Sequence, residues 1–119
     1  MPLIELFKNF RDKYMRSSIE KLEFPEFPPD EVRRYKIIFS GIVQGVGFRY
    51  EAWLIAEKLG LNGFARNLPN KDVMVEVQGP KNKIDHFIKC MESIPRIVIE
   101  DKVLEELPLK DEKGFTPVY

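Results

Sequence analysis

The chain has 119 residues, which suggests one domain. Basic and acidic residues both number 19, so no overall field draws the protein to nucleic acid or anionic lipid, and any anion site must be local. No run of about 18 apolar residues occurs, so no membrane span is predicted. Cys90 is the only cysteine, which excludes an internal disulfide, and the N-terminus does not resemble a secretion signal, so we expect a cytoplasmic protein.

The first segment, residues 1–24, is predicted to be an amphipathic helix that runs over residues 2–23. Its apolar positions recur at spacings of three and four and include Leu3, Leu6, Phe7, Phe10 and Tyr14. Such a stripe has to be covered by docking on the domain, by pairing with another copy of the chain or by a membrane surface. Five basic against four acidic residues are too balanced for strong lipid attraction, so we favour docking or self-association.

Residues 25–34 are predicted to be a proline-rich linker. Pro25, Pro28 and Pro29 lack backbone donors and push the residues before them out of the helical region, so the helix should end ahead of them. We expect a semi-rigid connector, followed by a domain that spans residues 35–119.

Strand and helix patterns alternate along this domain. Runs of β-branched and aromatic residues predict strands, and apolar spacings of three and four predict helices. The predicted elements are a strand at 35–43, a helix with Phe48, Ala52, Ile55, Ala56 and Leu59 buried, strands at 63–68 and 73–77, a helix with Ile84, Phe87, Ile88, Met91 and Ile94 buried, a strand at 97–107 and a short strand at 114–119. This order predicts an α+β fold, the ferredoxin-like βαββαβ sandwich, in which two helices cover one face of an antiparallel sheet.

The stretch from Gly41 to Arg49, GIVQGVGFR, follows the first predicted strand and leads into the first helix. Its glycines allow a close backbone approach and conformations closed to other residues. Successive N–H groups in such a turn, next to a helix N-terminus, form a concavity that prefers anions. We therefore predict an oxyanion cradle made by the main-chain N–H groups of Gln44, Gly45, Val46, Gly47 and Phe48.

Arg49 stands where this cradle meets the helix. Its planar guanidinium has five donors and binds phosphate or carboxylate in bidentate fashion, at about 1.5–3 kcal/mol for each charge-assisted hydrogen bond. A lone arginine at a helix start is more often simply solvated. The glycine-rich lead-in favours a functional arginine that faces a bound phosphoryl group.

Two blocks of the sequence resemble the signature of the acylphosphatases. The first is the stretch from Gly41 to Arg49, and the second is LGLNGFARN at residues 59–67. The resemblance covers residues 35–119. It implies the same fold and the hydrolysis of a small-molecule acyl phosphate to carboxylate and inorganic phosphate, without a metal or another cofactor.

The resemblance also assigns roles to two side chains. In acylphosphatases the arginine of the first block binds the substrate phosphate, and Arg49 matches it. The family's catalytic asparagine follows a Gly-aromatic-x-Arg pattern and falls on Asn67, whose amide would hold a water in line with phosphorus. Without the resemblance, Asn67 reads as a cap for the turn at Leu68 and Pro69.

Three positions depart from the family's pattern. Phe64 replaces a frequent tryptophan, which is a mild change. Leu68 replaces a frequent small polar residue, and the loss of a supporting hydrogen bond would lower activity. Pro117 interrupts the last strand, which is tolerable at a sheet edge.

Leu68 and the N-terminal helix keep a second hypothesis open, namely a non-catalytic phosphate-binding or regulatory module. A variant is the acylphosphatase-like domain of hydrogenase-maturation carbamoyltransferases, but zinc-binding cysteine clusters are absent from this chain. An RNA-recognition motif shares the sandwich, yet the glycine run follows the first strand instead of lying in the third. A P-loop is excluded because no Gly-Lys-Ser/Thr ending follows.

The remaining side chains that could carry chemistry have simpler interpretations. Arg66 should point away from Asn67 because neighbouring residues of a strand face opposite sides. His86 is the only histidine, so neither a metal site nor a serine-histidine triad is supported. Trp53 and Cys90 are expected to pack in or beside the core.

Overall fold

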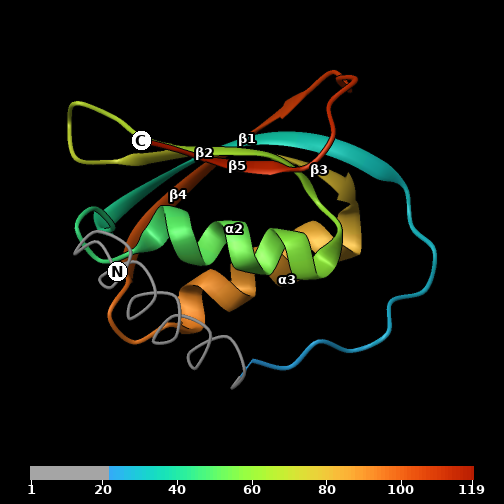
Figure 1. The fold of residues 1–119 in the computed structure, drawn as a ribbon, viewed down its shortest axis with the longest axis horizontal. Coiled ribbons are helices and arrows are strands. Elements are labelled where there is room, and N and C mark those ends of the chain that lie inside the picture. The colour runs from blue at the N-terminus through green and yellow to red at the C-terminus, as the bar shows by residue number, and fades with distance from the viewer. Residues whose placement is uncertain (1–21) are drawn as a thin grey trace, which may run out of the picture.

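The structure is a computed structural model that describes residues 22–119. The helix predicted over residues 2–23 therefore lies almost wholly outside the described residues. The elements are β1 (Val32–Ile42), α2 (Phe48–Leu59), β2 (Asn62–Asn67), β3 (Val73–Pro80), α3 (Lys81–Ser93), β4 (Val98–Leu107) and β5 (Phe115–Val118). Both helices lie beneath one face of the sheet (Figure 1). The ferredoxin-like sandwich is confirmed.

The sheet has the order β4-β1-β3-β2-β5, and its neighbours are antiparallel except for the last pair. The prediction of an antiparallel sheet is therefore wrong for the fifth strand, which pairs parallel to β2. The topology explains this direction. Strands β4 and β2 run in opposite directions, so β4 finishes at the end of the sheet where β2 begins. A chain that crosses over from there and pairs with β2 must run in the same direction as β2.

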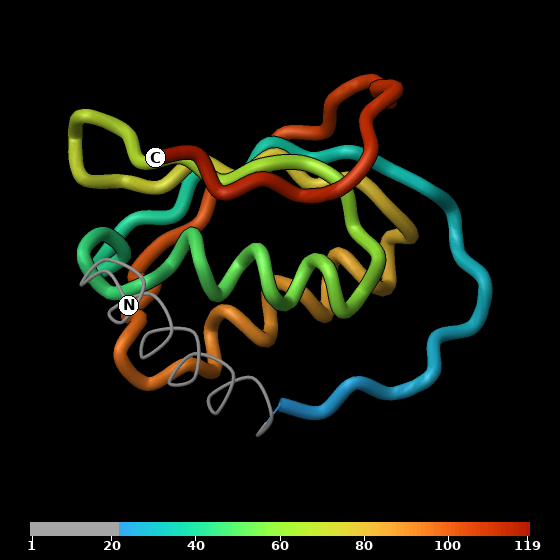
Figure 2. Tube along the Cα trace, viewed as in Figure 1, coloured from blue at the N-terminus to red at the C-terminus, as the bar shows by residue number. Residues whose placement is uncertain are grey.

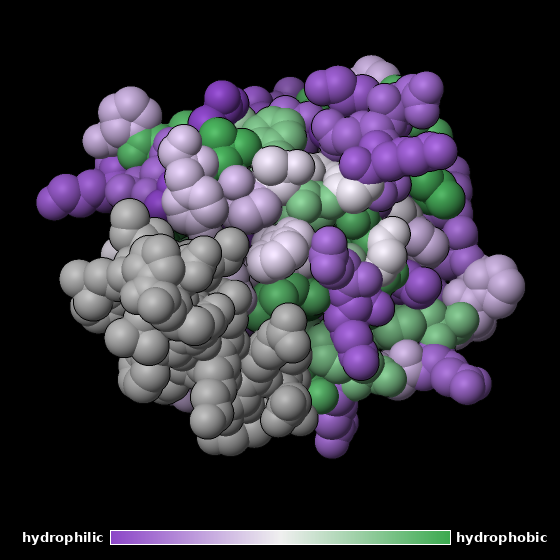
Figure 3. Space-filling view, viewed as in Figure 1, coloured by the Kyte–Doolittle hydropathy of each residue, from purple (hydrophilic) through white to green (hydrophobic). Residues whose placement is uncertain are grey.

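The core lies between the sheet and the two helices. Alternate residues of β3, namely Val73, Val75 and Val77, are fully buried. The predicted apolar faces of both helices are buried as well, and all ten residues named for them belong to the core. Figure 3 shows the outer surface on one side, where hydrophilic side chains surround smaller apolar areas.

Helix α2 ends as its sequence indicates. Gly60 takes the left-handed conformation, with φ of 69°. The Gly60 N–H donates to the Glu57 carbonyl at 3.1 Å, and the Leu61 N–H donates to the Ala56 carbonyl at 2.8 Å. Leu61 is buried just after the cap, which directs the chain back into β2.

The connector before β1 packs against α3. Phe24 and Phe27 both contact the His86 ring edge-on, with centroids 5.7 and 5.3 Å away. The Asn82 amide donates to the Pro28 carbonyl at 2.8 Å. Residues 22–31 run from the helix layer around to the sheet (Figure 2). Strand β1 begins at Val32, three residues earlier than predicted, because its first residues pair with the end of β3.

The crossing from β4 to β5 is tied to the helix-free face of the sheet. Arg34 is 1% exposed and forms ion pairs with Glu76 at 2.9 Å and Glu112 at 3.2 Å. Gln78 accepts from the Lys110 N–H and donates to its carbonyl, both at 2.9 Å. These contacts direct the chain into β5.

None of the helices within residues 22–119 is long and apolar enough to cross a membrane.

Candidate active site

A cavity of about 390 Å³ opens at the end of the molecule where β1 leads into α2. The loop from Val43 to Gly47, the start of α2, the end of β2 and the C-terminus all meet at this end (left in Figure 1). The lining residues are Val43, Gly45, Val46, Gly47, Phe48, Arg49, Tyr50, Asn67, Arg96 and Tyr119. The fold therefore brings Arg49 and Asn67 into one cavity, although they stand on different elements.

The cradle loop depends on the conformation of two glycines. Gly45 and Gly47 have φ of 73° and 78°, in the left-handed region. A Cβ on Gly45 would meet nothing within 4 Å, so the backbone conformation and not the available space calls for glycine there. The Gly47 carbonyl accepts the Glu51 N–H at 3.0 Å, which begins α2. The loop thus joins a helix N-terminus, an arrangement that favours anions.

Arg49 is the second residue of α2, and its guanidinium reaches the C-terminus. Nη1 donates to the Val118 carbonyl at 2.8 Å. The guanidinium carbon lies 4.2 Å from the centroid of the Tyr119 ring. A solvated arginine would lack these contacts, and they hold the charged group at the cavity.

Asn67 is the last residue of β2 and lines the same cavity. The turn that follows has its own asparagine, since Asn70 Oδ1 accepts the Asp72 N–H at 3.1 Å. Asn70 therefore supplies a side-chain hydrogen bond that stabilises this turn. Arg66 is exposed, as strand alternation predicts, and its guanidinium lies 5.5 Å from the Phe64 ring.

Gln44 is the one predicted cradle residue that does not line the cavity. Its Nε2 donates to the carbonyls of Leu68 and Asp72, both at 2.8 Å. The side chain therefore ties the cradle loop to the turn after Asn67. The Leu68 backbone takes part in this tie, and its N–H also donates to the Asp72 carbonyl at 2.8 Å.

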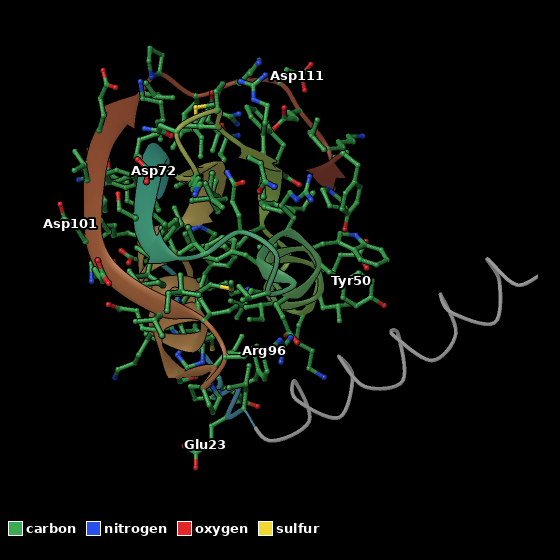
Figure 4. All side chains as sticks on the ribbon, turned by 90° about the vertical axis from the view of Figure 1, so that its left-hand side faces the viewer. Glu23, Tyr50, Asp72, Arg96, Asp101 and Asp111 are labelled. Carbon is green, nitrogen blue, oxygen red and sulfur yellow. The ribbon has the colours of Figure 1, made fainter. Side chains whose placement is uncertain are left out.

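An ion pair between the half-buried Arg96 and the buried Glu51, next to the cradle loop, was not predicted. Arg96 Nη2 donates to Glu51 Oε1 at 2.6 Å, and Arg96 Nε donates to the Val46 carbonyl at 2.8 Å. Glu51 is fully buried, and this burial raises the pKa of its carboxyl although Arg96 opposes the shift. Figure 4 looks onto this end of the molecule and places Arg96 near the start of α2.

The sequence did carry a signal for Glu51. It stands three residues after Phe48 and four before Ile55, both on the buried face of α2. A carboxylate at such a position needs a cationic partner. No pattern in the sequence points to Arg96, because it lies in the turn between α3 and β4, far from residue 51 along the chain.

The other side chains considered from the sequence stand apart from the cavity. Cys90 is buried, and burial raises the pKa of its thiol to about 11, so it is a poor nucleophile. His86 Nε2 lies 2.6 Å from the Glu23 carbonyl. Among residues 22–119, no three histidine, cysteine, aspartate or glutamate side chains are grouped as a metal site would need.

Sequence comparisons agree on one family. A family model described as acylphosphatase matches residues 35–117. An acylphosphatase of Vibrio parahaemolyticus is 44% identical over 85 residues, which are 71% of this chain and 94% of that protein. One of Clostridium beijerinckii is 42% identical over 88 residues, which are 72% of this chain and 98% of that protein.

Solved structures give the same fold. The acylphosphatase of Bacillus subtilis superposes with a TM-score of 0.69 at 32% identity, over 75% of this chain and all of that one. Full-length HypF, in a phosphate- and nucleotide-bound form, superposes with a TM-score of 0.69 at 31% identity. That match covers 79% of this chain but 13% of HypF, so it concerns one part of a longer protein.

Proposed function

This chain belongs to the acylphosphatase family, and we propose that its cavity hydrolyses the carboxyl-phosphate bond of small-molecule acyl phosphates. The products are a carboxylate and inorganic phosphate. The observation that carries the assignment of residues is the meeting of Arg49 and Asn67 in one cavity, next to a loop of main-chain N–H groups.

In this proposal the phosphoryl group binds between the cradle and the guanidinium. The N–H groups of residues 44–48 and the donors of Arg49 hold its oxygens and stabilise the charge that moves onto them as the bond loosens. One donor of Arg49 already binds the Val118 carbonyl, which leaves others for the phosphoryl oxygens.

Asn67 positions the nucleophile. Its amide both donates and accepts, so it can hold a water in line with phosphorus. The water oxygen forms a bond to phosphorus while the bond from phosphorus to the acyl oxygen breaks, and the protons of the water stay on the new phosphate or pass to solvent. The leaving carboxylate is stable as an anion and needs no general acid, so positioning and electrostatics suffice.

The test is hydrolysis of an aryl acyl phosphate, followed by spectrophotometry without added metal, with inorganic phosphate as inhibitor. We expect Arg49→Ala to lower kcat/KM by about a thousandfold. Arg49→Lys should fail as well, because a point charge does not reproduce the planar fork. Arg66→Ala is the matched control, since Arg66 is exposed and outside the cavity. Equal activity in Arg49→Ala and Arg66→Ala would reject the site.

A non-catalytic phosphate-binding module is the weaker alternative. It rested on the helix predicted over residues 2–23 and on Leu68, whose apolar side chain cannot support Asn67 by a hydrogen bond. The backbone bonds of Leu68 with Gln44 and Asp72 offer a different support for the same turn. Relatives that align with this chain over most of their own length are named acylphosphatases, and this also favours the enzyme.

For residues 2–23 we propose a packing role, either docking on residues 35–119 or pairing with a second copy. Deleting residues 2–21 tests it and leaves the contacts of Phe24 and Phe27 with His86 in place. A truncated protein with an unchanged melting temperature and an unchanged oligomeric state would contradict both forms. A cytoplasmic location remains part of the proposal, based on the single cysteine.

A further inference from the structure

We infer that Arg96, oriented by Glu51, is a positioning residue that aims a cradle N–H group at the phosphate. The inference rests on the proposed function, because it concerns how the cradle of that site keeps its shape. It assigns a task to both side chains of the Glu51–Arg96 ion pair next to the loop.

The argument starts from the peptide between Val46 and Gly47. In a trans peptide the C=O and the N–H lie in one plane and point in opposite directions. Arg96 Nε holds the Val46 carbonyl at 2.8 Å. The Gly47 N–H must therefore point away from Arg96, and this fixes the direction of one donor of the cradle.

Without the bond from Arg96, the peptide between Val46 and Gly47 could flip easily. It lies between Val46 and a left-handed glycine, and Gly45 on the other side is left-handed as well. Glycine gives little resistance to the change of φ and ψ that a peptide flip needs. A flipped peptide would exchange a donor for a carbonyl oxygen in the cradle, and that oxygen would repel a bound phosphate.

Glu51 explains why Arg96 stays in place. Its buried carboxylate binds Nη2 at 2.6 Å, while its own N–H donates to the Gly47 carbonyl at 3.0 Å. Arg96 thus holds the peptide that follows Val46, and the first hydrogen bond of α2 holds the next peptide, which follows Gly47. The carboxylate also neutralises the guanidinium, so Arg96 differs from Arg49, whose guanidinium contacts a carbonyl and an aromatic ring.

The experiment measures KM and kcat for an aryl acyl phosphate and the inhibition constant of inorganic phosphate. We expect Arg96→Gln to raise KM and the inhibition constant together, by about tenfold, with kcat changed by less than about twofold. Glu51→Gln should raise both by about threefold, because it releases the guanidinium. Arg33→Gln is the matched control. It removes an arginine that binds Glu31 and Glu106, both at 2.9 Å, away from the cavity, and should change neither constant.

Arg96→Lys separates positioning from charge. It keeps the positive charge but cannot bind Glu51 and Val46 through one planar fork, so it should behave as Arg96→Gln does. If circular dichroism shows that Arg96→Gln is unfolded, the kinetic constants of Arg96→Lys test the positioning role in its place. If Arg96 instead bound phosphate directly, Glu51→Gln would free a cation and lower the inhibition constant, and that result would overturn the inference.

Amide NMR separates this inference from the proposed function. In the unmodified protein, titration with inorganic phosphate should shift the Gly45 and Gly47 amide signals. If it does, and Arg96→Gln binds phosphate with equal affinity and equal shifts, the positioning role fails while the proposed function stands. If the unmodified protein shows neither turnover nor these shifts, both fail together.

Discussion

The guanidinium of Arg49 lies against the ring of Tyr119, the last residue of the chain, with 4.2 Å between the guanidinium carbon and the ring centroid. The neighbouring Val118 carbonyl accepts a hydrogen bond from the same guanidinium at 2.8 Å. The C-terminus reaches this place because β5 runs parallel to β2 and toward the cavity. The fifth strand thus carries Tyr119, the residue that follows it, to the wall of the candidate site.

Removal of the Tyr119 ring should weaken binding of phosphate. The ring is 71% exposed, so its cation–π contact is worth about 0.5–1 kcal/mol, which corresponds to a two- to fivefold rise in KM for Tyr119→Ala. Tyr119→Phe keeps the ring and should keep the wild-type KM. Steady-state kinetics of the two variants test this, and an equal rise in both would assign the effect to the hydroxyl group.

Asn67→Ala should lower kcat and leave phosphate binding almost unchanged. The amide acts on the water and not on the phosphoryl oxygens, so a loss of about a hundredfold in kcat is expected, with the inhibition constant of phosphate within about twofold. Asn70→Ala is the control, because Asn70 shapes the same turn from outside the cavity. Equal losses in rate and in phosphate affinity would rule out a water-positioning role for Asn67.

Gln44→Leu should destabilise the protein and widen the cradle. It removes two hydrogen bonds, to the carbonyls of Leu68 and Asp72, at a cost of about 1–2 kcal/mol in the free energy of unfolding. Urea denaturation measures this cost, and KM should rise because the loop is no longer tied to the turn after Asn67. Gln44→Glu should be at least as harmful, since a carboxylate faces the same two carbonyls. An unchanged denaturation midpoint in both variants would contradict the tie.

The buried carboxyl of Glu51 should make stability depend on pH in a defined direction. Burial raises its pKa, so the folded protein holds the proton more tightly than the unfolded chain does. From the ordinary pKa of about 4.3 up to the raised one, the free energy of unfolding therefore falls as the pH rises.

Glu51→Gln isolates this effect because the amide does not titrate. The free energy of unfolding of the wild type, minus that of Glu51→Gln, should decrease as the pH is raised from about 4 through the raised pKa. Urea denaturation at several pH values measures the difference. An increase over this range would mean that Arg96 outweighs burial and lowers the pKa of Glu51.

Local patterns in the sequence were enough for the helices and strands after residue 31 and for most of the cavity wall. The spacing of apolar residues predicted both helix faces, because each turn of a helix presents every third or fourth residue to the same side. The glycine run predicted the cradle, because Gly45 and Gly47 take conformations that other residues avoid. The resemblance carried by residues 41–49 and 59–67 supplied Arg49 and Asn67.

Contacts between distant segments were decided by the tertiary structure alone. The parallel direction of β5 follows from where β4 ends, and this places Val118 and Tyr119 on Arg49. The partnership of Glu51 with Arg96 likewise depends on how the α3–β4 turn packs under α2. Such pairs have no fixed spacing along the chain, so a periodicity or a motif cannot reveal them. The sequence by itself determined which residues fold into which element, and only the packing of those elements decided which charges meet.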